Sequence, residues 1–324
     1  MIPRRTFMAG MAAVMAAPMA VTAQQAKWRI GCLIPGTPSA YQSRIAAFMN
    51  GLREHGLVEG QNVTLEFRWV EDDSVASRLA SELIRVGVDV IVTAGTPLAL
   101  ATKEATSSLP IVVAAAGDFL GTHLVTDLGR PGGNVTGTSD LTVELSGKRL
   151  ELLKEVDPRI SRIAVFWAAS NPGAARSLRE LQAAAPALKI PLLSVEIRSI
   201  GDIDSAFERA RTAKVDGTVI VQDPFMLLHR KRIIELAAHH RLPAIYGSAT
   251  FVEEGGLVSY GADIPDLYRR AAGFVDKILK GAKPGDLPIE QPTKFQLVIN
   301  LRAAKAIHLM VPKAILVRAD EVIQ

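Results

Sequence analysis

The stretch Asp89–Leu98, which reads DVIVTAGTPL, joins an apolar strand pattern directly to a helix start. Its first half carries apolar residues on both faces, as expected of a buried strand in a parallel sheet. Thr96 and Pro97 follow, and a polar residue at the N-cap with proline at the first helical position is a preferred pair for beginning a helix. The sequence therefore predicts a helix that begins where this strand ends.

The same junction occurs three more times, at Thr37-Pro38, Asn171-Pro172 and Asp223-Pro224. In open α/β sheets ligands bind at the carboxyl ends of the strands, where helix N-termini present N–H groups and a positive dipole end. Two junctions fall in each half of the chain, which favours two similar lobes facing one cleft. Ordinary helix capping remains the alternative for any junction taken alone.

Strand and helix patterns alternate through both halves, and 324 residues suffice for two lobes of ordinary size. The sequence predicts an α/β protein in which each lobe is a parallel sheet flanked by helices. We expect residues 24–140 and 263–324 to form the first lobe and residues 141–262 the second, with the final strand and helix returning to the first. A hinge is expected near 139–141 and 261–263.

Residues 1–23 have the pattern of an export signal. Arg4 and Arg5 precede Thr6, Phe7 and Met8 in a twin-arginine arrangement, a short apolar stretch follows, and small residues stand at a cleavage site after Ala23. A serine or threonine is usual at the position of Pro3, so export by the general secretory route stays open, as does a retained anchor. The expected location is the periplasm.

The formal net charge is only +4, and about +2 without Arg4 and Arg5 of the signal. This is weak electrostatics for a polyanion, so no nucleic-acid partner is implied. The one tight basic cluster, 230–232, lies in an amphipathic helix pattern. Cys32 is the single cysteine and lies in the first strand pattern, where we expect it to be a buried apolar residue.

Motifs of catalysis and cofactor binding are missing. There is no G-x-S-x-G, H-E-x-x-H or phosphate-binding G-x-x-x-x-G-K-[ST] pattern, and no G-x-G-x-x-G follows the first strand. The six histidines are dispersed, so neither a metal nor a cofactor is predicted. A binding protein without catalytic activity is favoured. An exported hydrolase or isomerase remains the alternative, with Asp118 and Asp223 as its acid–base pair.

Polar and aromatic residues near the predicted strand ends are the candidate ligand contacts. The hydroxyls and helix starts suit a carboxylate, the two acids suit an ammonium or hydroxyl, and the asparagine can donate and accept. Together they indicate a small zwitterion such as an amino acid. Core packing is the alternative for the tyrosine, which could otherwise stack on the ligand. The candidates are Thr37, Ser39, Thr96, Asp118, Asn171, Asp223 and Tyr246.

Several segments together carry a family resemblance that runs from about Trp28 to the end of the chain. They are 56–63 (GLVEGQNV), 130–137 (RPGGNVTG), 148–153 (KRLELL), 242–246 (LPAIY), 256–261 (GLVSYG), 291–295 (QPTKF) and 318–321 (RADE). With these segments the chain resembles the substrate-binding proteins of ABC transporters, in the branch of the type I periplasmic-binding fold related to tryptophan- and tyrosine-binding members.

The resemblance implies a two-lobe receptor, monomeric or weakly dimeric, that closes around one small organic ligand and presents it to a membrane permease. A ligand-binding sensor module is a further alternative. By position, the ligand-facing loops of the family correspond to those around Thr37, Thr96, Asp118, Asn171, Asp223 and Tyr246. The loops at Pro35-Gly36 and at Asn171–Gly173 depart from the family pattern, so the ligand's identity does not carry over.

Overall fold

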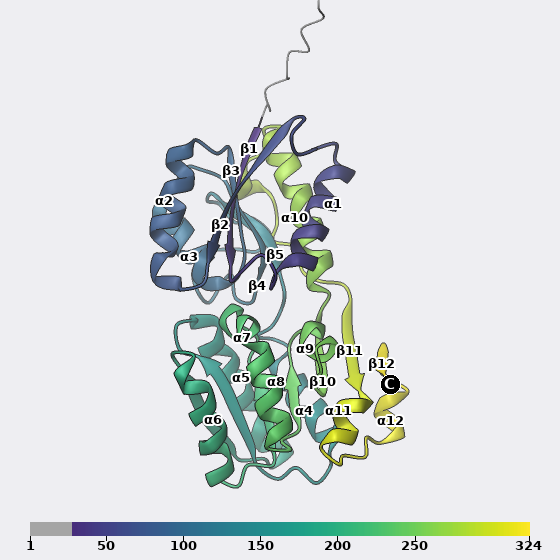
Figure 1. Cartoon of the computed structure of the whole chain (residues 1–324). Coiled ribbons are helices and arrows are strands. Elements are labelled where there is room, and N and C mark those ends of the chain that lie inside the picture. The colour runs from purple at the N-terminus through teal and green to yellow at the C-terminus, as the bar shows by residue number, and fades with distance from the viewer. Residues whose placement is uncertain (1–27) are drawn as a thin grey trace, which may run out of the picture.

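A computed structural model describes residues 28–324, and the predicted export signal lies outside these residues. Within them the strands form two sheets, one of five and one of seven strands. Each sheet and its helices make one lobe, and the two lobes are stacked end to end (Figure 1). No helix of this part of the chain has the length and apolar character needed to cross a membrane.

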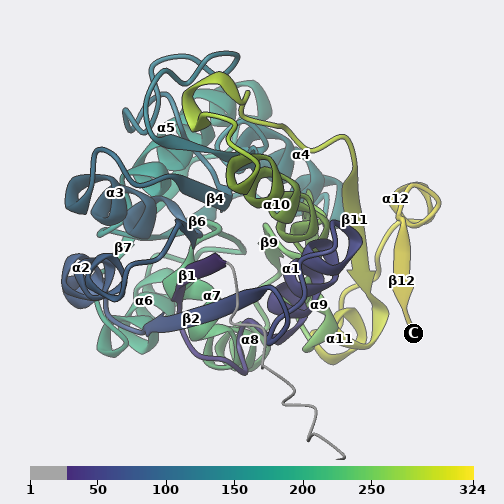
Figure 2. The same ribbon diagram turned by 90° about the horizontal axis from the view of Figure 1, so that it is seen from above.

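The first lobe contains the five-stranded sheet in the order β2-β1-β3-β4-β5, and all of its pairs are parallel. Two helices cover one face and two cover the other (Figures 1 and 2). The strands are β1 (Trp28–Pro35), β2 (Val63–Val70), β3 (Val90–Thr93), β4 (Ile111–Ala116) and β5 (Val135–Ser139). The helices are α2 (Ala76–Val86) and α3 (Thr96–Ala105) on one face, and α1 (Gln42–Glu54) and α10 (Ile264–Leu279) on the other.

The second lobe contains the seven-stranded sheet in the order β12-β11-β10-β9-β8-β6-β7. Its strands are β6 (Ile163–Ala168), β7 (Leu192–Ile197), β8 (Gly217–Ile220), β9 (Ala244–Tyr246), β10 (Val258–Ala262), β11 (Phe295–Asn300) and β12 (Glu321–Ile323). Its helices are α4 (Ser146–Val156), α5 (Pro172–Leu188), α6 (Gly201–Thr212), α7 (Pro224–Leu228), α8 (Arg230–His239), α9 (Ala249–Glu253), α11 (Leu301–Ala306) and α12 (Lys313–Leu316).

Alternate residues of the second sheet enter different cores, as the two-residue period of a strand requires. In β6, Ile163 and Val165 join the cluster under α4 and α5, whereas Ala164 and Phe166 join the cluster under α6 and α8. A strand buried on both faces explains the continuous apolar runs of the sequence. The predicted α/β class, with parallel sheets flanked by helices, is confirmed. The exception is the antiparallel pairing of β11 with β10, so β11 and its parallel neighbour β12 run against the rest of the sheet.

The prediction that the final strand and helix return to the first lobe is wrong. α10 does pack on α1 of the first lobe, and the following segment stays there as far as Glu290, whose N–H bonds to the carbonyl of Gly137. The chain then crosses back, and β11 pairs with β10 of the second sheet. β10 has β9 on one side only, so its other edge is open to a further strand, and β11 and β12 cover it.

Of the four predicted helix starts, those at Asn171 and Asp223 are confirmed as N-caps of α5 and α7. The other two are displaced. α1 begins only at Gln42, because Gly36, at φ +73°, leads into a turn over the next residues. The cap of α3 is Gly95, at φ +74°, so Thr96 is already the first helical residue.

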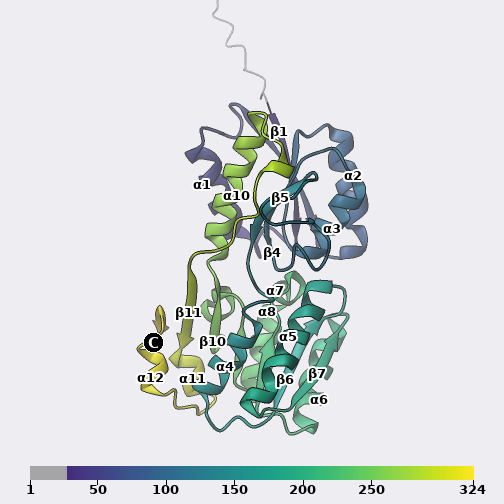
Figure 3. The ribbon, with the colours of Figure 1, turned by 180° about the vertical axis from the view of Figure 1, so that it is seen from behind.

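The chain passes between the lobes three times. The first crossing joins β5 to α4, the second joins β10 to α10, and the third leads from Glu290 to β11. The crossings lie together along one side of the molecule, away from α2, α3 and α6 (Figures 1 and 3). The opposite side of the interface between the lobes is therefore free of connecting chain (Figures 1 and 3).

We expect Gly51→Ala to lower the free energy of unfolding by roughly 1–3 kcal/mol. A Cβ at Gly51 of α1 would overlap the backbone carbonyl oxygen of Arg269 and would lie 2.9 Å from Cβ of Ala272, both on α10. Neither atom belongs to a flexible side-chain end, so the two helices would have to separate.

Urea unfolding of both variants provides the measurement. Gly147→Ala is the matched control, because a Cβ there meets Ala184 only at 3.4 Å and the position is helical. The control is expected to be neutral or stabilising by up to about 1 kcal/mol. A Gly51→Ala protein as stable as this control would contradict the described packing of α1 on α10.

Candidate ligand-binding site

A cavity lies between the two lobes, at the carboxyl ends of strands from both sheets. Gly95 and Ala116 follow or end strands of the first lobe, whereas Asn171 and Asp223 follow strands of the second. The cavity volume open to the centres of water molecules is about 60 Å³. One water requires roughly 10–15 Å³ of such volume, so the cavity has space for a small molecule.

Asn171 and Asp223 cap their own helices and also bind each other. Asn171 Oδ1 accepts the N–H of Gly173 at 2.9 Å, and Asp223 Oδ1 accepts the N–H of Phe225 at 2.7 Å. The two side chains are also joined by a hydrogen bond, in which Asn171 Nδ2 donates to Asp223 Oδ2 at 2.7 Å. Burial raises the pKa of Asp223 to about 6, although these hydrogen bonds oppose the shift. The second lobe thus presents a buried carboxyl that is mostly ionised at neutral pH.

Arg44 of α1 brings a buried positive charge to the cavity from the first lobe. It is 6% exposed, and its guanidinium carbon lies 4.8 Å from the ring centroid of Tyr41. Among residues 28–324 no carboxylate lies within ion-pair distance of this guanidinium. Buried charges are ordinarily paired, and the charge of Arg44 acts on Asp140 without a direct ion pair, so the guanidinium has capacity for a closer anionic partner.

Asp140 adds a second buried carboxyl on the first crossing. Its Oδ1 accepts the N–H of Thr142 and its Oδ2 accepts Nε2 of Gln222, each at 3.0 Å. Burial raises the pKa of Asp140, while the bond from Thr142 and the charge of Arg149 act in the opposite direction. Asp140 and both of its hydrogen-bond donors, Thr142 and Gln222, line the cavity, whereas Arg149 does not. The crossing itself is therefore part of the site.

Arg149 anchors this crossing from a position outside the cavity wall. It lies on α4 at 2% exposure, donates Nε to the carbonyl of Tyr260 at 2.7 Å and donates Nη1 to the carbonyl of Thr142 at 2.9 Å. Burial lowers its pKa to about 10, which leaves it protonated at neutral pH. Because Tyr260 lies in β10, one guanidinium joins the first crossing to the strand from which the second crossing leaves.

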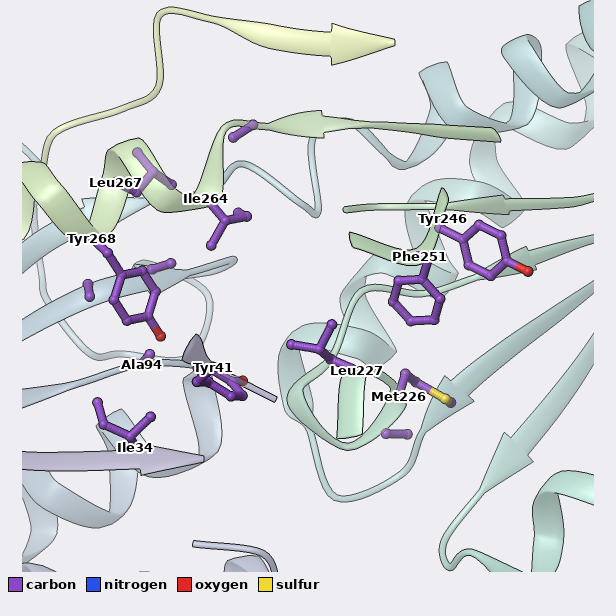
Figure 4. Packing of buried hydrophobic residues seen from close by; sticks show 14 of the residues in the cluster. Ile34, Tyr41, Ala94, Met226, Leu227, Tyr246, Phe251, Ile264, Leu267 and Tyr268 are labelled. Carbon is purple, nitrogen blue, oxygen red and sulfur yellow. The ribbon is translucent and has the colours of Figure 1, made fainter. Parts of the chain in front are cut away.

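Aromatic and aliphatic side chains make the rest of the wall. Tyr41 and Tyr268 come from the first lobe, and Leu227 and Phe251 face them from the second (Figure 4). All four belong to one hydrophobic cluster that continues across both lobes. Tyr246 lies one layer behind, stacked on Phe251 with ring centroids 4.5 Å apart. An apolar wall with a few buried charged groups is typical of small-molecule sites.

The structure places three of the seven predicted contacts in the cavity wall, namely Thr96, Asn171 and Asp223. Thr37 and Ser39 lie outside it, with hydroxyls 3.1 Å apart in an exposed turn. Asp118 is buried but forms an ion pair with Arg176, and Tyr246 is core beneath Phe251. The two acids of the alternative enzyme hypothesis, Asp118 and Asp223, do not share the cavity wall.

Sequence reasoning missed Arg44, Tyr41, Tyr268, Phe251 and Asp140. One signal was available: Arg44 lies on the buried side of α1, together with Phe48 and Leu52, where a charged residue is out of place. The aromatic residues gave no signal, because a tyrosine in an amphipathic helix has the same pattern whether it packs in a core or lines a cavity. In residues 28–324, no three His, Cys, Asp or Glu side chains group as metal ligands would.

Two lobes of helix-flanked sheets, joined by three crossings and enclosing a small cavity of mixed apolar and charged character, define a solute-binding protein. The comparisons agree. The sequence profile of the family described as ABC transporter substrate binding protein matches residues 35–323. The chain belongs to that family.

Three relatives match most of this chain, one by sequence and two by solved structure. A tyrosine-binding protein of Clostridioides difficile (strain R20291) is 26% identical over 264 residues, which cover 81% of this chain and 75% of that protein. A conserved domain protein of Vibrio cholerae is 28% identical, with TM-score 0.87 over 91% of this chain and 99% of that one. The ABC domain of a Streptococcus pneumoniae protein in complex with L-Trp is 28% identical, with TM-score 0.85 over 92% of this chain and 100% of that one. The predicted type I periplasmic-binding fold is confirmed.

We expect Arg149→Met to lower the free energy of unfolding by roughly 2–5 kcal/mol, because it strips two buried carbonyls and the nearby Asp140 of their partner. The neighbouring Lys148→Met is the control. It removes only a surface ion pair with Glu151 and is expected to change the free energy of unfolding by less than about 0.5 kcal/mol. Urea unfolding at pH 7 measures both. Equal stability of the two variants would exclude a bracing role for Arg149.

Proposed function

We propose that the protein binds an L-amino acid with an aromatic or large apolar side chain between its lobes, as the substrate-binding component of an ABC importer. The observation that carries this proposal is the buried guanidinium of Arg44, which lines the cavity and, among residues 28–324, forms no direct ion pair with a carboxylate, although its charge lowers the pKa of Asp140. A ligand carboxylate supplies that partner, and a charge-assisted bidentate pair with arginine is among the stronger interactions available.

The other groups of the cavity fit the rest of such a ligand. Asp223 and Asp140 are acceptors for an α-ammonium, and both are held by hydrogen bonds from their own surroundings. Tyr41, Tyr268 and Phe251 provide the apolar wall for the side chain, where aromatic contacts favour offset or edge-to-face packing. The names of the relatives support the same ligand class, since one is a tyrosine-binding protein and another was solved with L-Trp.

Transport follows from differential binding to two arrangements of the lobes. A ligand that contacts Arg44 in one lobe and Asp223 in the other stabilises the closed arrangement, and a hinge at the crossings allows it. The closed protein then presents its ligand to a permease in the membrane. Residues 1–23 would direct the protein to the periplasm, where a receptor of this kind must act.

Calorimetric titration with L-tryptophan, L-tyrosine and L-leucine tests the ligand class. We expect Arg44→Met to weaken binding of the preferred amino acid at least tenfold, because the buried charge that pairs with its carboxylate is lost. Arg53→Met, an exposed position on the same helix, is the matched control and is expected to bind as the wild type does. An Arg44→Met protein with unchanged affinity would overturn the assignment, and recovery of chemically altered ligand would favour an enzyme.

Binding is also expected to weaken in acid. The pKa of Asp223 is raised to about 6 in the free protein, so its carboxylate is mostly ionised at pH 7 and mostly protonated at pH 5. The affinity for an amino acid should fall about tenfold between pH 7 and pH 5, since loss of the charge removes most of its attraction for an ammonium.

Indole-3-propionate is a useful control ligand for this experiment, because it has the aromatic ring and carboxylate without the ammonium. Its affinity is expected to stay level or to improve as Asp223 is protonated. A fall with decreasing pH that is the same for both ligands would show that Asp223 does not face the ammonium.

A further inference from the structure

Beside the cavity, an ion pair joins the two lobes directly. Asp118 follows β4 in the first lobe, and Arg176 lies on α5 in the second, with Arg176 Nε 3.0 Å from Asp118 Oδ2. Neither residue lines the cavity. The Asp118 side chain is buried at 8% exposure, whereas that of Arg176 is 37% exposed. A ligand therefore need not touch the pair for the pair to hold the lobes together.

The carboxylate of Asp118 is prepared by its own lobe to receive a cation. Its Oδ1 accepts the N–H of Gly121 at 2.8 Å, which fixes the orientation of the group. Its Oδ2 is almost completely excluded from solvent and accepts no aligned hydrogen bond. The guanidinium of Arg176 is thus the group that compensates this oxygen, and it comes from the opposite lobe.

Gly121 provides the space for the guanidinium. A Cβ built at this glycine would overlap Nη1 of Arg176 and would lie 2.6 Å from Asp118 Oδ2. The backbone of Gly121 is not in the left-handed region, so its conformation is open to other residues. The absence of a side chain at Gly121 leaves the volume that the Arg176 guanidinium of the other lobe occupies.

We propose that Asp118 and Arg176 form a latch that stabilises the closed arrangement of the lobes whether or not a ligand is present. This inference rests on the opening and closing of the cleft in the proposed function. When the lobes separate, both groups return to water, so closing costs their desolvation and gains their attraction. Without Arg176, closing would bury the Asp118 carboxylate with no partner, which makes the closed state less favourable. The apparent affinity for any ligand is the intrinsic one scaled by the closed fraction, and the latch raises that fraction.

A distance measurement without ligand tests the latch. Ser77 on α2 and Ser205 on α6 are exposed, one on each lobe, on the side away from the crossings (Figure 1). Cysteines at these two positions can be spin-labelled selectively, because the native Cys32 is fully buried and burial raises the pKa of its thiol. Pulsed electron paramagnetic resonance then gives the distribution of distances between the spin labels on the two lobes. We expect Arg176→Met to shift it toward longer distances.

Two further variants make the test specific. Arg179→Met removes an exposed arginine from the same helix and should leave the distribution as in the wild type. Gly121→Ala keeps both charges but fills the space of the guanidinium, so it should shift the distribution as Arg176→Met does. Thermal unfolding checks that each variant is folded. An Arg176→Met distribution that coincides with the wild type, in the folded protein without ligand, overturns the latch.

L-Tryptophan is the probe for the second half of the experiment. Where it binds, Arg176→Met should speed its dissociation on the order of fivefold, because the closed complex loses the ion pair that holds the lobes together. Equal dissociation rates in the variant and the wild type would overturn the latch. Failure of the wild type to bind this amino acid or its relatives would count against the proposed ligand class, and the ligand-free distances would still decide on the latch.

Discussion

Three crossings on one side of the molecule constrain everything else in this structure. Two sheets joined at one edge can separate only at the other, so in the proposed function the crossings set both the axis of closure and the side from which a ligand enters (Figure 3). Arg149 makes the constraint stricter, because it binds Thr142 of the first crossing and Tyr260 beside the second. Asp140, on the first crossing, faces the cavity. The axis of motion and the binding site therefore share residues.

The cavity concentrates charge that the protein alone leaves incompletely balanced. Arg44 brings a cation from one lobe, and Asp223 brings a carboxyl of raised pKa from the other. In the proposed function, a zwitterion carries the two opposite charges that complement these two groups, and a ligand with only one charge complements one lobe. Selectivity for zwitterions and closure of the lobes would then have the same electrostatic origin.

Local signals in the sequence predicted local features well. Asn171 and Asp223 cap helices because a short polar side chain before proline determines the helix start within two or three residues. Thr37 and Thr96 have the same dipeptide, but Gly36 and Gly95 adopt positive φ and shift where each helix begins. The sequence also predicted a strand at 295–300. It did not predict that this strand joins the second lobe, because the open edge of β10 exists only in the assembled fold. Arg44 and the aromatic wall depended on the same assembled fold.

The interleaving of the two lobes has a consequence for the order in which the chain can fold. During synthesis all five strands of the first sheet emerge early, yet α10, which covers the face shared with α1, emerges only after β10 of the second lobe. The second sheet in turn lacks β11 and β12 until the chain has left the first lobe again. Neither lobe can close its core before nearly the whole polypeptide is available. Long-range closure of this kind makes folding slow and leaves apolar sheet faces uncovered meanwhile. Until α10 and β11 emerge, those faces are the part of the nascent chain most prone to aggregation.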